Sequence, residues 1–256
     1  TCDLIINKIM AKKHIRKYGD FYAKDKEYLN NPKFVWTFFA KLIKKHKNSQ
    51  KLLWDIGCAD ASMLKYLEKI FPKWDFQGTD NNKFLLEHAK KNTKISKIFF
   101  ENLNKKLKKN TKKADIIYCG GVHAIYDDIK FFLDQVILRG NKNSEIYVHG
   151  IFNPNPIDMI VRLRNCTKKK FLNDKIDLIG WNRFSFKTVS EILKKNKKVK
   201  NHKFIHVNFP KSLKVKRKAK EPERSWTTIH NNKLHFVNAT NIIEDFIYES
   251  YSSSAK

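Results

Sequence analysis

The stretch KLLWDIGCADASMLKYLEKIF, residues 51–71, decides which fold the sequence predicts. It begins with Lys51–Ile56, a short apolar run that ends at Gly57 and is typical of a buried strand. From Ala61 to Phe71 the apolar residues recur at helical spacing, and Pro72 ends the pattern. The stretch therefore predicts a strand, a tight turn and a helix.

Similar units precede residue 150. Further strands are predicted at Asp75–Thr79, Lys97–Phe100, Asp115–Cys119 and Glu145–Gly150, with helices at Phe34–His46, Lys83–Lys91 and Ile129–Leu138. Strands that alternate with helices at this spacing indicate βαβ units and a parallel sheet. The sequence thus predicts an α/β fold.

The turn after the first strand carries an acid and several small residues. Asp55 stands at the strand end, followed by Gly57, Cys58 and Ala59. Small residues let the backbone approach a ligand, and the helix that follows presents unpaired N–H groups. Such a turn also occurs in α/β proteins that bind nothing there, so the turn alone does not establish a ligand.

The next predicted strand ends at a second acid, Asp80. A carboxylate at this place can accept both hydroxyls of a ribose, as in adenosine recognition. The alternative is that Asp80 caps the following helix. The glycine pattern is not GxGxxG, which makes a dinucleotide less favoured.

With these features in place, residues 51–130 resemble the core of class I S-adenosylmethionine-dependent methyltransferases, in which a D-x-G-x-x motif precedes a helix. The resemblance implies a Rossmann-like fold: a mostly parallel seven-stranded sheet, helices on both faces, and a small cap insertion after strand five. The sequence departs from the family where the second and third motif glycines are Ala59 and Ala61.

The resemblance also implies S-adenosylmethionine as cofactor and assigns residues to it. These are Asp55, Gly57, Cys58 and Ala59 around the methionine part, Asp80 and Asn81 at the ribose, Glu101 and Asn102 beside adenine, and Cys119, Gly120 and Gly121 beneath the sulfur. His123 lies just beyond and could deprotonate an acceptor hydroxyl, since imidazole titrates near neutrality. A core or capping histidine is the alternative.

The second half resembles methyltransferases found with polysaccharide or sugar-modification genes. The segments concerned are GIFNPNPIDMIVRLR, GWNRFSFKTVSEIL and ERSWTTIHNNKLHFVNATNII. Aromatic faces and amides suit a sugar, and arginines suit a phosphate or an acidic sugar. The expected substrate residues are Asn153, Arg162, Arg164, Trp181, Asn182 and Trp226. The tryptophans could equally belong to the core.

We expect a helical segment over 1–50, the cofactor-binding core over 51–150, and cap segments and final strands of the same domain over 151–251. Those final strands are predicted at Lys203–Phe209 and Leu234–Val237, and residues 252–256 as a disordered tail. No apolar run is long enough to cross a membrane, and no signal peptide is recognised. The scattered cysteines indicate neither a metal site nor disulfides, and favour the cytoplasm.

The net charge of +28 invites a nucleic-acid interpretation. Only seven of the 53 basic residues are arginines, and Asn, Ile and Phe are abundant, which favours compositional drift over a selected phosphate-binding surface. The sequence therefore predicts O-methylation, or else N-methylation, of a small-molecule or carbohydrate acceptor. An RNA methyltransferase and a non-enzymatic adenosine-ligand sensor remain alternatives, although CGGV stands where base-amine enzymes often carry an N/D-PP-Y/F tetrad.

Overall fold

The computed structural model describes residues 31–92, 97–105, 107, 111–161, 181–207, 225–230, 233–238 and 241–249. The chain divides into two compact units, which we describe separately. The first comprises residues 1–160 and 182–204, and the second comprises residues 161–181 and 205–256.

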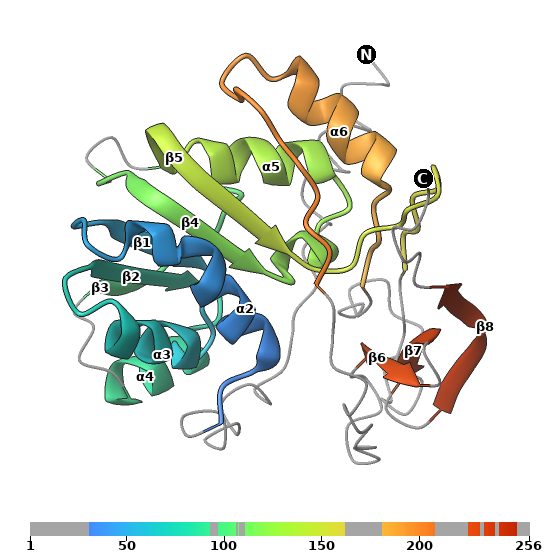
Figure 1. The fold of residues 1–256 in the computed structure, drawn as a ribbon, viewed down its shortest axis with the longest axis horizontal. Helices are drawn as coiled ribbons and strands as arrows, with labels where there is room; N and C mark the ends of the chain where they lie inside the picture. The colour runs from blue at the N-terminus through green and yellow to red at the C-terminus, as the bar shows by residue number, and fades with distance from the viewer. Residues whose placement is uncertain are drawn as a thin grey trace. The chain divides into compact units, whose positions relative to one another are not determined.

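A parallel sheet forms the centre of the first unit (Figure 1). Its strands are β1 (Leu52–Ile56), β2 (Asp75–Asp80), β3 (Lys97–Phe100), β4 (Ala114–Gly120) and β5 (Gly140–His149), in the order β3-β2-β1-β4-β5. The chain leaves β1 toward β2 on one side and later returns to β4 on the other. In such sheets ligands bind outside the carboxyl ends of the strands where the order reverses, so the ends of β1, β2 and β4 are the place to look for a site.

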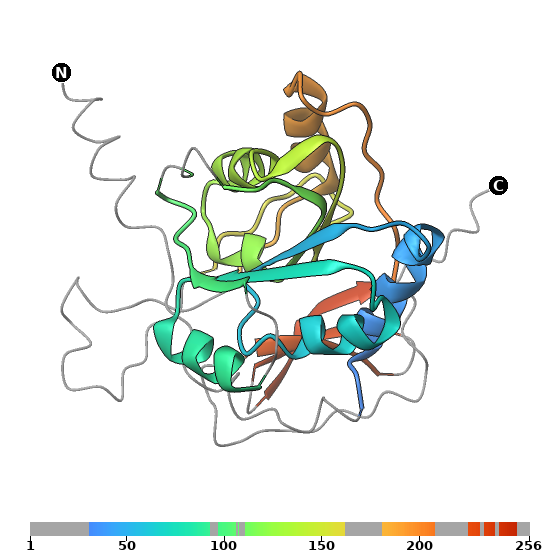
Figure 2. The same cartoon turned by 90° about the vertical axis from the view of Figure 1, so that its left-hand side faces the viewer.

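Helices cover both faces of this sheet, as Figure 2 shows. One face carries α2 (Phe34–Ile43), α3 (Ser62–Ile70) and α4 (Lys83–Asn92), and the other carries α5 (Ile129–Ile137) and α6 (Phe186–Lys195). Short 3-10 helices, η3 (Lys44–His46) and η4 (Val122–Ile125), follow α2 and β4. Because side chains alternate along a strand, each buried strand supplies both faces.

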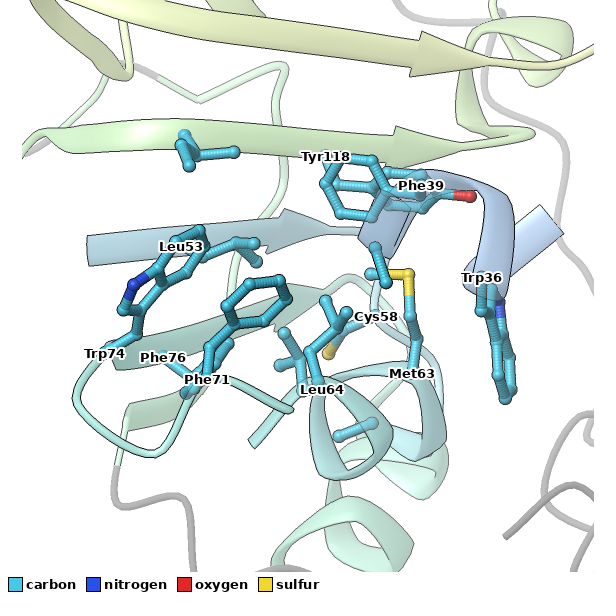
Figure 3. Close-up of a cluster of buried hydrophobic side chains, with 14 of the residues drawn as sticks. Trp36, Phe39, Leu53, Cys58, Met63, Leu64, Phe71, Trp74, Phe76 and Tyr118 are labelled. Atoms are coloured by element: carbon cyan, nitrogen blue, oxygen red, sulfur yellow. The ribbon is translucent and has the colours of Figure 1, made fainter. Parts of the chain in front are cut away.

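An aromatic cluster fills the face beneath α2 and α3 (Figure 3). Phe39 from α2 lies with its ring centroid 4.5 Å from that of Tyr118 on β4. Phe71 stacks on Trp74 at 4.3 Å, directly after α3. Burial of each such side chain contributes about 1.5–3 kcal/mol, so this cluster holds the cofactor-motif helix α3 firmly on the sheet.

The opposite face has its own core, made by Trp54 and Ile117 from the strands and Phe132 and Val136 from α5. It also contains Arg139, whose side chain is fully buried between α5 and β5. The sheet is thus apolar on both faces, as the predicted buried strands require.

The second unit contains a separate antiparallel sheet of β6 (Ser225–His230), β7 (Lys233–Asn238) and β8 (Asn241–Glu249), in the order β6-β7-β8. Each of these strands pairs with its neighbour along the chain.

The parallel α/β sheet with helices on both faces is confirmed, but a single seven-stranded sheet is not found in the described residues. Leu234–Val237 lies within β7 and pairs with β6 and β8 instead of joining the parallel sheet. Residues 203–207 form no strand, and 208–209 lie outside the described residues. A strand pattern predicts extended backbone but not the partner, and here short hairpin connections favour local pairing. Residues 1–30 and the tail 252–256 also lie outside, and the expected domain boundaries stay predictions.

Candidate functional site

The turn between β1 and α3 crosses the carboxyl end of β2. Gly57 and Cys58 both donate their backbone N–H to the carbonyl of Thr79, at 2.7 and 2.9 Å. Gly57 has φ +78°, and a Cβ there would lie 2.2 Å from Cγ2 of Val122 in η4. Only glycine fits this position, because the backbones of the two loops approach each other here.

Two alanines in the same turn also have left-handed backbone, Ala59 at φ 49° and Ala61 at φ 59°. An L-residue in this region costs about 1–2 kcal/mol, which explains why glycines are usual at the matching family positions. Asp60 lies between them and accepts from the N–H and the hydroxyl of Ser62, at 3.1 and 2.8 Å. The turn is therefore tight and held at the start of α3.

Asp80 ties this turn to the end of β2. Its Oδ2 accepts from the Ala59 N–H at 3.0 Å, and its Oδ1 accepts from the Asn82 N–H at 2.8 Å. The helix that follows is capped by Asn82 instead, whose Oδ1 accepts from Phe84 N–H at 3.0 Å, so the capping alternative for Asp80 is wrong. Each carboxylate oxygen has about two acceptor positions, and the contacts above use one on each.

Asp55, on β1 beside Gly78 and Tyr118, is the most deeply buried carboxylate at this edge. Burial raises its pKa well above the usual range, and the neighbouring carboxylates of Asp80 and Asp60 raise it further. No hydrogen bond or countercharge from the described part of the chain is among the influences on it.

The pKa of Asp80 is also raised by burial, although N–H groups of Asn82, Ala59 and Asn81 oppose that shift. In a chain of net charge +28, three interacting carboxylates at one strand edge make a local site for positive charge.

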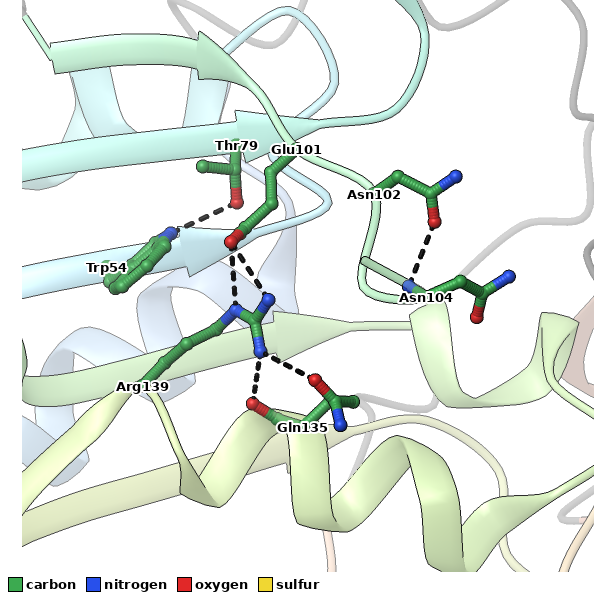
Figure 4. Close-up of polar contacts among 7 residues, drawn as sticks. All are labelled: Trp54, Thr79, Glu101, Asn102, Asn104, Gln135 and Arg139. Atoms are coloured by element: carbon green, nitrogen blue, oxygen red, sulfur yellow. Dashed lines mark hydrogen bonds and ion pairs between the residues drawn. The ribbon is translucent and has the colours of Figure 1, made fainter. Parts of the chain in front are cut away.

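Glu101 and Asn102 follow β3. The Glu101 carboxylate receives two bonds from the buried Arg139, from Nε at 3.2 Å and from Nη2 at 2.9 Å, both on Oε1 (Figure 4). Asn102 accepts from the Asn104 N–H at 2.9 Å and shapes the following turn. Arg139 was not foreseen as part of the site, because its position before β5 gives no motif that points to Glu101.

The end of β4 brings together the three residues expected beneath a methyl-donating sulfur. The thiol of Cys119 is fully buried and donates to the carbonyl of Ile56 at 3.4 Å, so it faces β1 and not solvent. Gly121 has φ +76° and donates its N–H to the His149 carbonyl at 2.8 Å. A Cβ on Gly120 would lie 2.8 Å from the Tyr118 ring. These positions supply backbone and shape.

His123 lies in η4 and is completely enclosed. Its ring stacks on Phe152 at 4.6 Å, and a Cβ on Gly150 would lie 1.9 Å from the imidazole. Burial, together with His149, lowers its pKa to about 3, so the ring is neutral near pH 7. The ring could exchange a proton with an acceptor only after a local rearrangement, and its catalytic role stays a prediction.

The expected substrate residues are not brought together by the described residues. Asn153 donates to the Ile157 carbonyl and accepts from the Asn155 N–H, at 2.8 and 3.0 Å. Asn182 donates to Tyr126 and Asp127, at 2.8 Å in each case. Both amides thus fasten loops inside the first unit.

Trp181 and Trp226 belong to the second unit, and Arg162 and Arg164 lie outside the described residues. Their roles stay predictions. One further residue that no sequence pattern marked is Tyr126, a buried phenol after β4 whose pKa is raised by burial and by carboxylates that include Asp80 and Glu101.

Within the described ranges, no group of three or more His, Cys, Asp or Glu residues is arranged to hold a metal ion. In that same part of the chain, no helix is long and apolar enough to cross a membrane.

No family model and no curated protein matches the chain. Among solved structures it is similar to the plantazolicin methyltransferase BpumL in complex with a pentazolic desmethylPZN analogue and SAH, at 20% identity and a TM-score of 0.41, over 49% of this chain and 51% of that one. It is also similar to the sugar N-methyltransferase KedS8 from Streptoalloteichus sp, at 12% identity and a TM-score of 0.44, over 55% and 56%. The chain spans about half the length of these structures, and likenesses of this extent do not decide a function.

Proposed function

We propose that the protein is an S-adenosylmethionine-dependent methyltransferase that methylates a hydroxyl of a small-molecule or carbohydrate acceptor. The observation that carries the proposal is the pairing of Asp55 and Asp80 around the turn after β1. One carboxylate is buried without a countercharge, and the other is fixed by two N–H groups with acceptor positions to spare.

The residues fit the chemistry of this cofactor. S-adenosylmethionine carries a sulfonium and an ammonium, and positive charge offsets the cost of ionising buried, mutually repelling carboxylates such as Asp55 and Asp80. It also carries a ribose diol, for which Asp80 has acceptor positions left. We assign the turn of Gly57, Cys58 and Ala59 to the methionine part, and the segment after β3 to the base.

Little covalent help from the protein is required, because the bound cofactor itself supplies an electrophilic methyl group. The chain's contribution is to hold the acceptor in line and to exclude water, which can supply several kcal/mol, roughly 7–11 at most. The rigid backbone around Gly57 and Gly121 serves this purpose, since both glycines have left-handed φ and lie in loops fixed by the neighbouring strands.

Asp80→Ala tests the cofactor assignment. We expect the affinity for S-adenosylhomocysteine, measured by calorimetry, to fall at least about tenfold, because charge-assisted hydrogen bonds contribute about 1.5–3 kcal/mol each. Asp60→Asn is the matched control, since its carboxylate contacts only Ser62 among the printed bonds and the amide oxygen can still accept. Wild-type protein that gives neither heat nor thermal shift with this ligand would refute the methyltransferase proposal.

The acceptor class rests on chemistry that suits a sugar, namely aromatic faces such as Trp181 and Trp226 beside polar amides. The decisive measurement is transfer of labelled methyl to a panel of nucleotide sugars and glycans. A protein that binds the cofactor but transfers no methyl to any acceptor would support the sensor alternative.

The net charge of +28 keeps an RNA methyltransferase as the second candidate. If the lysines result from compositional drift, RNA binding is weak and is lost steeply between low and physiological salt. Filter binding across a salt series separates the two. RNA binding that survives physiological salt, together with label entering RNA and no glycan, would favour the RNA enzyme.

A further inference from the structure

Arg139 is held in one position beneath the end of β3, although its side chain does not reach solvent. Its Nη1 donates to the backbone carbonyl and to Oε1 of Gln135, one turn earlier at the end of α5. Its Cζ lies 5.9 Å from the ring centroid of Trp54, within the range of a cation–π contact. The guanidinium is therefore fixed before Glu101 is considered.

The two bonds from Arg139 to Glu101 end on the same oxygen. Nε and Nη2 both donate to Oε1, whereas an arginine fork commonly donates to both oxygens of a carboxylate. Oε2 is buried and has no hydrogen-bond partner in the part of the chain that the structure describes. A buried carboxylate oxygen without a donor is costly, so a ligand N–H that reaches it would be strongly favoured.

Glu101 lies beside the acid to which we assign the ribose. Its backbone N–H donates to the Asp80 carbonyl at 3.0 Å, so the two carboxylates come from adjacent strand ends. A ligand whose diol binds Asp80 therefore has its base within the neighbourhood of Glu101.

We propose that Arg139 is a positioning residue that holds Glu101 so that Oε2 accepts a hydrogen bond from an amino group of the bound ligand. This inference rests on the proposed function, in which that amine is the 6-amino group of adenine. A base with a carbonyl at the same place would set one acceptor against another. The arrangement thus selects a 6-amino purine and rejects a 6-oxo purine.

The test compares S-adenosylhomocysteine with its deaminated analogue, S-inosylhomocysteine, by calorimetry. We expect wild-type protein to bind the amino form at least about 30-fold more tightly, within the range for sites that pair a specific donor. Glu101→Gln brings the ratio close to one, because an amide can present either a donor or an acceptor. Arg139→Lys lowers the ratio about tenfold, since an ammonium lacks the planar fork.

The ratio separates positioning from support of the fold. An arginine that serves stability alone would lower the melting temperature of Arg139→Lys and leave the ratio unchanged, which would overturn the inference. Lys130→Met is the control on the same helix, because its ion pair with Asp134 is exposed, and it should change neither quantity much.

Two outcomes distinguish this inference from the proposed function. If wild-type protein binds neither ligand, the proposed function fails and the inference fails with it. If it binds both with a ratio near one, only the inference fails. Should Arg139→Lys not fold, Gln135→Met removes one acceptor of Nη1, and we expect the ratio to fall about threefold; an unchanged ratio there would overturn the inference.

Discussion

Two buried carboxylates in the same sheet are treated in opposite ways. Glu101, below the end of β3, is compensated by the guanidinium of Arg139. Asp55, on β1, faces other carboxylates, and burial raises its pKa without a compensating cation among the influences on it. A carboxylate that only supported the fold would be expected to have a partner, as Glu101 has. The contrast identifies the ends of β1 and β2 as the place where stability is given up for ligand binding.

The largest expected effect breaks the compensated region. Arg139→Met leaves Glu101 buried beside an apolar side chain, and removing one partner of a buried ion pair costs about 3–5 kcal/mol. Urea unfolding followed by circular dichroism measures it. Lys45→Met, which breaks the exposed pair with Glu145, should cost under about 1 kcal/mol. Equal losses in the two variants would contradict the contrast.

Gly57→Ala has the next largest effect. The methyl would meet Val122 Cγ2 at 2.2 Å, and φ is +78°. Left-handed backbone and overpacking together cost roughly 2–4 kcal/mol. Thermal unfolding of Gly57→Ala and of Gly57→Ala with Val122→Ala checks the cause, since the double variant should recover the part that comes from the clash. No recovery would place the whole cost in the backbone.

Asp55→Asn sharpens the comparison from the other side. Because the pKa of Asp55 is raised in the folded protein, its favourable contribution is present below the unfolded pKa and is lost as the pH rises through the folded pKa. At neutral pH the asparagine variant should therefore be more stable than wild type by about 1–3 kcal/mol, and should bind S-adenosylhomocysteine more weakly.

The pH profile checks that sign. The gain from Asp55→Asn should vanish near pH 4 and grow as the pH rises. His123 and His149 act in the opposite direction: burial lowers their pKa values to about 3 and 4, so their contribution is present above the unfolded pKa and is lost as the pH falls. They are common to both proteins, so the difference between the two melting curves isolates Asp55. A variant less stable than wild type at pH 7 would show that Asp55 has a stabilising partner.

Ala59→Gly has the smallest expected effect. Glycine relieves the left-handed backbone at φ 49° but raises the entropy of the unfolded chain, so the net gain is about 0.5 kcal/mol or less. Differential scanning calorimetry should show a melting temperature equal to or slightly above that of wild type. A clear loss would mean that the methyl group packs against something the fold requires.

Much of the architecture could be predicted from local pattern, because periodicity and turn chemistry are properties of neighbouring residues. The run Lys51–Phe71 predicted β1, the turn and α3, and the acids at 55 and 80 were placed at one sheet edge because parallel strands end together. The same reasoning could not place the extended segment at 234–237, since a strand pattern carries no information about its partner.

The fine structure of the site depended on contacts between residues far apart in the sequence. Whether Asp80 caps a helix or ties two turns together is decided by Asn82 and Ala59, and whether Asn153 meets a substrate is decided by the carbonyl of Ile157. The partner of Glu101 is Arg139, 38 positions away, and no spacing rule joins them. Hydrogen-bond partners of buried side chains are chosen by packing in three dimensions, which is why only the tertiary structure separates the compensated carboxylate from the uncompensated one.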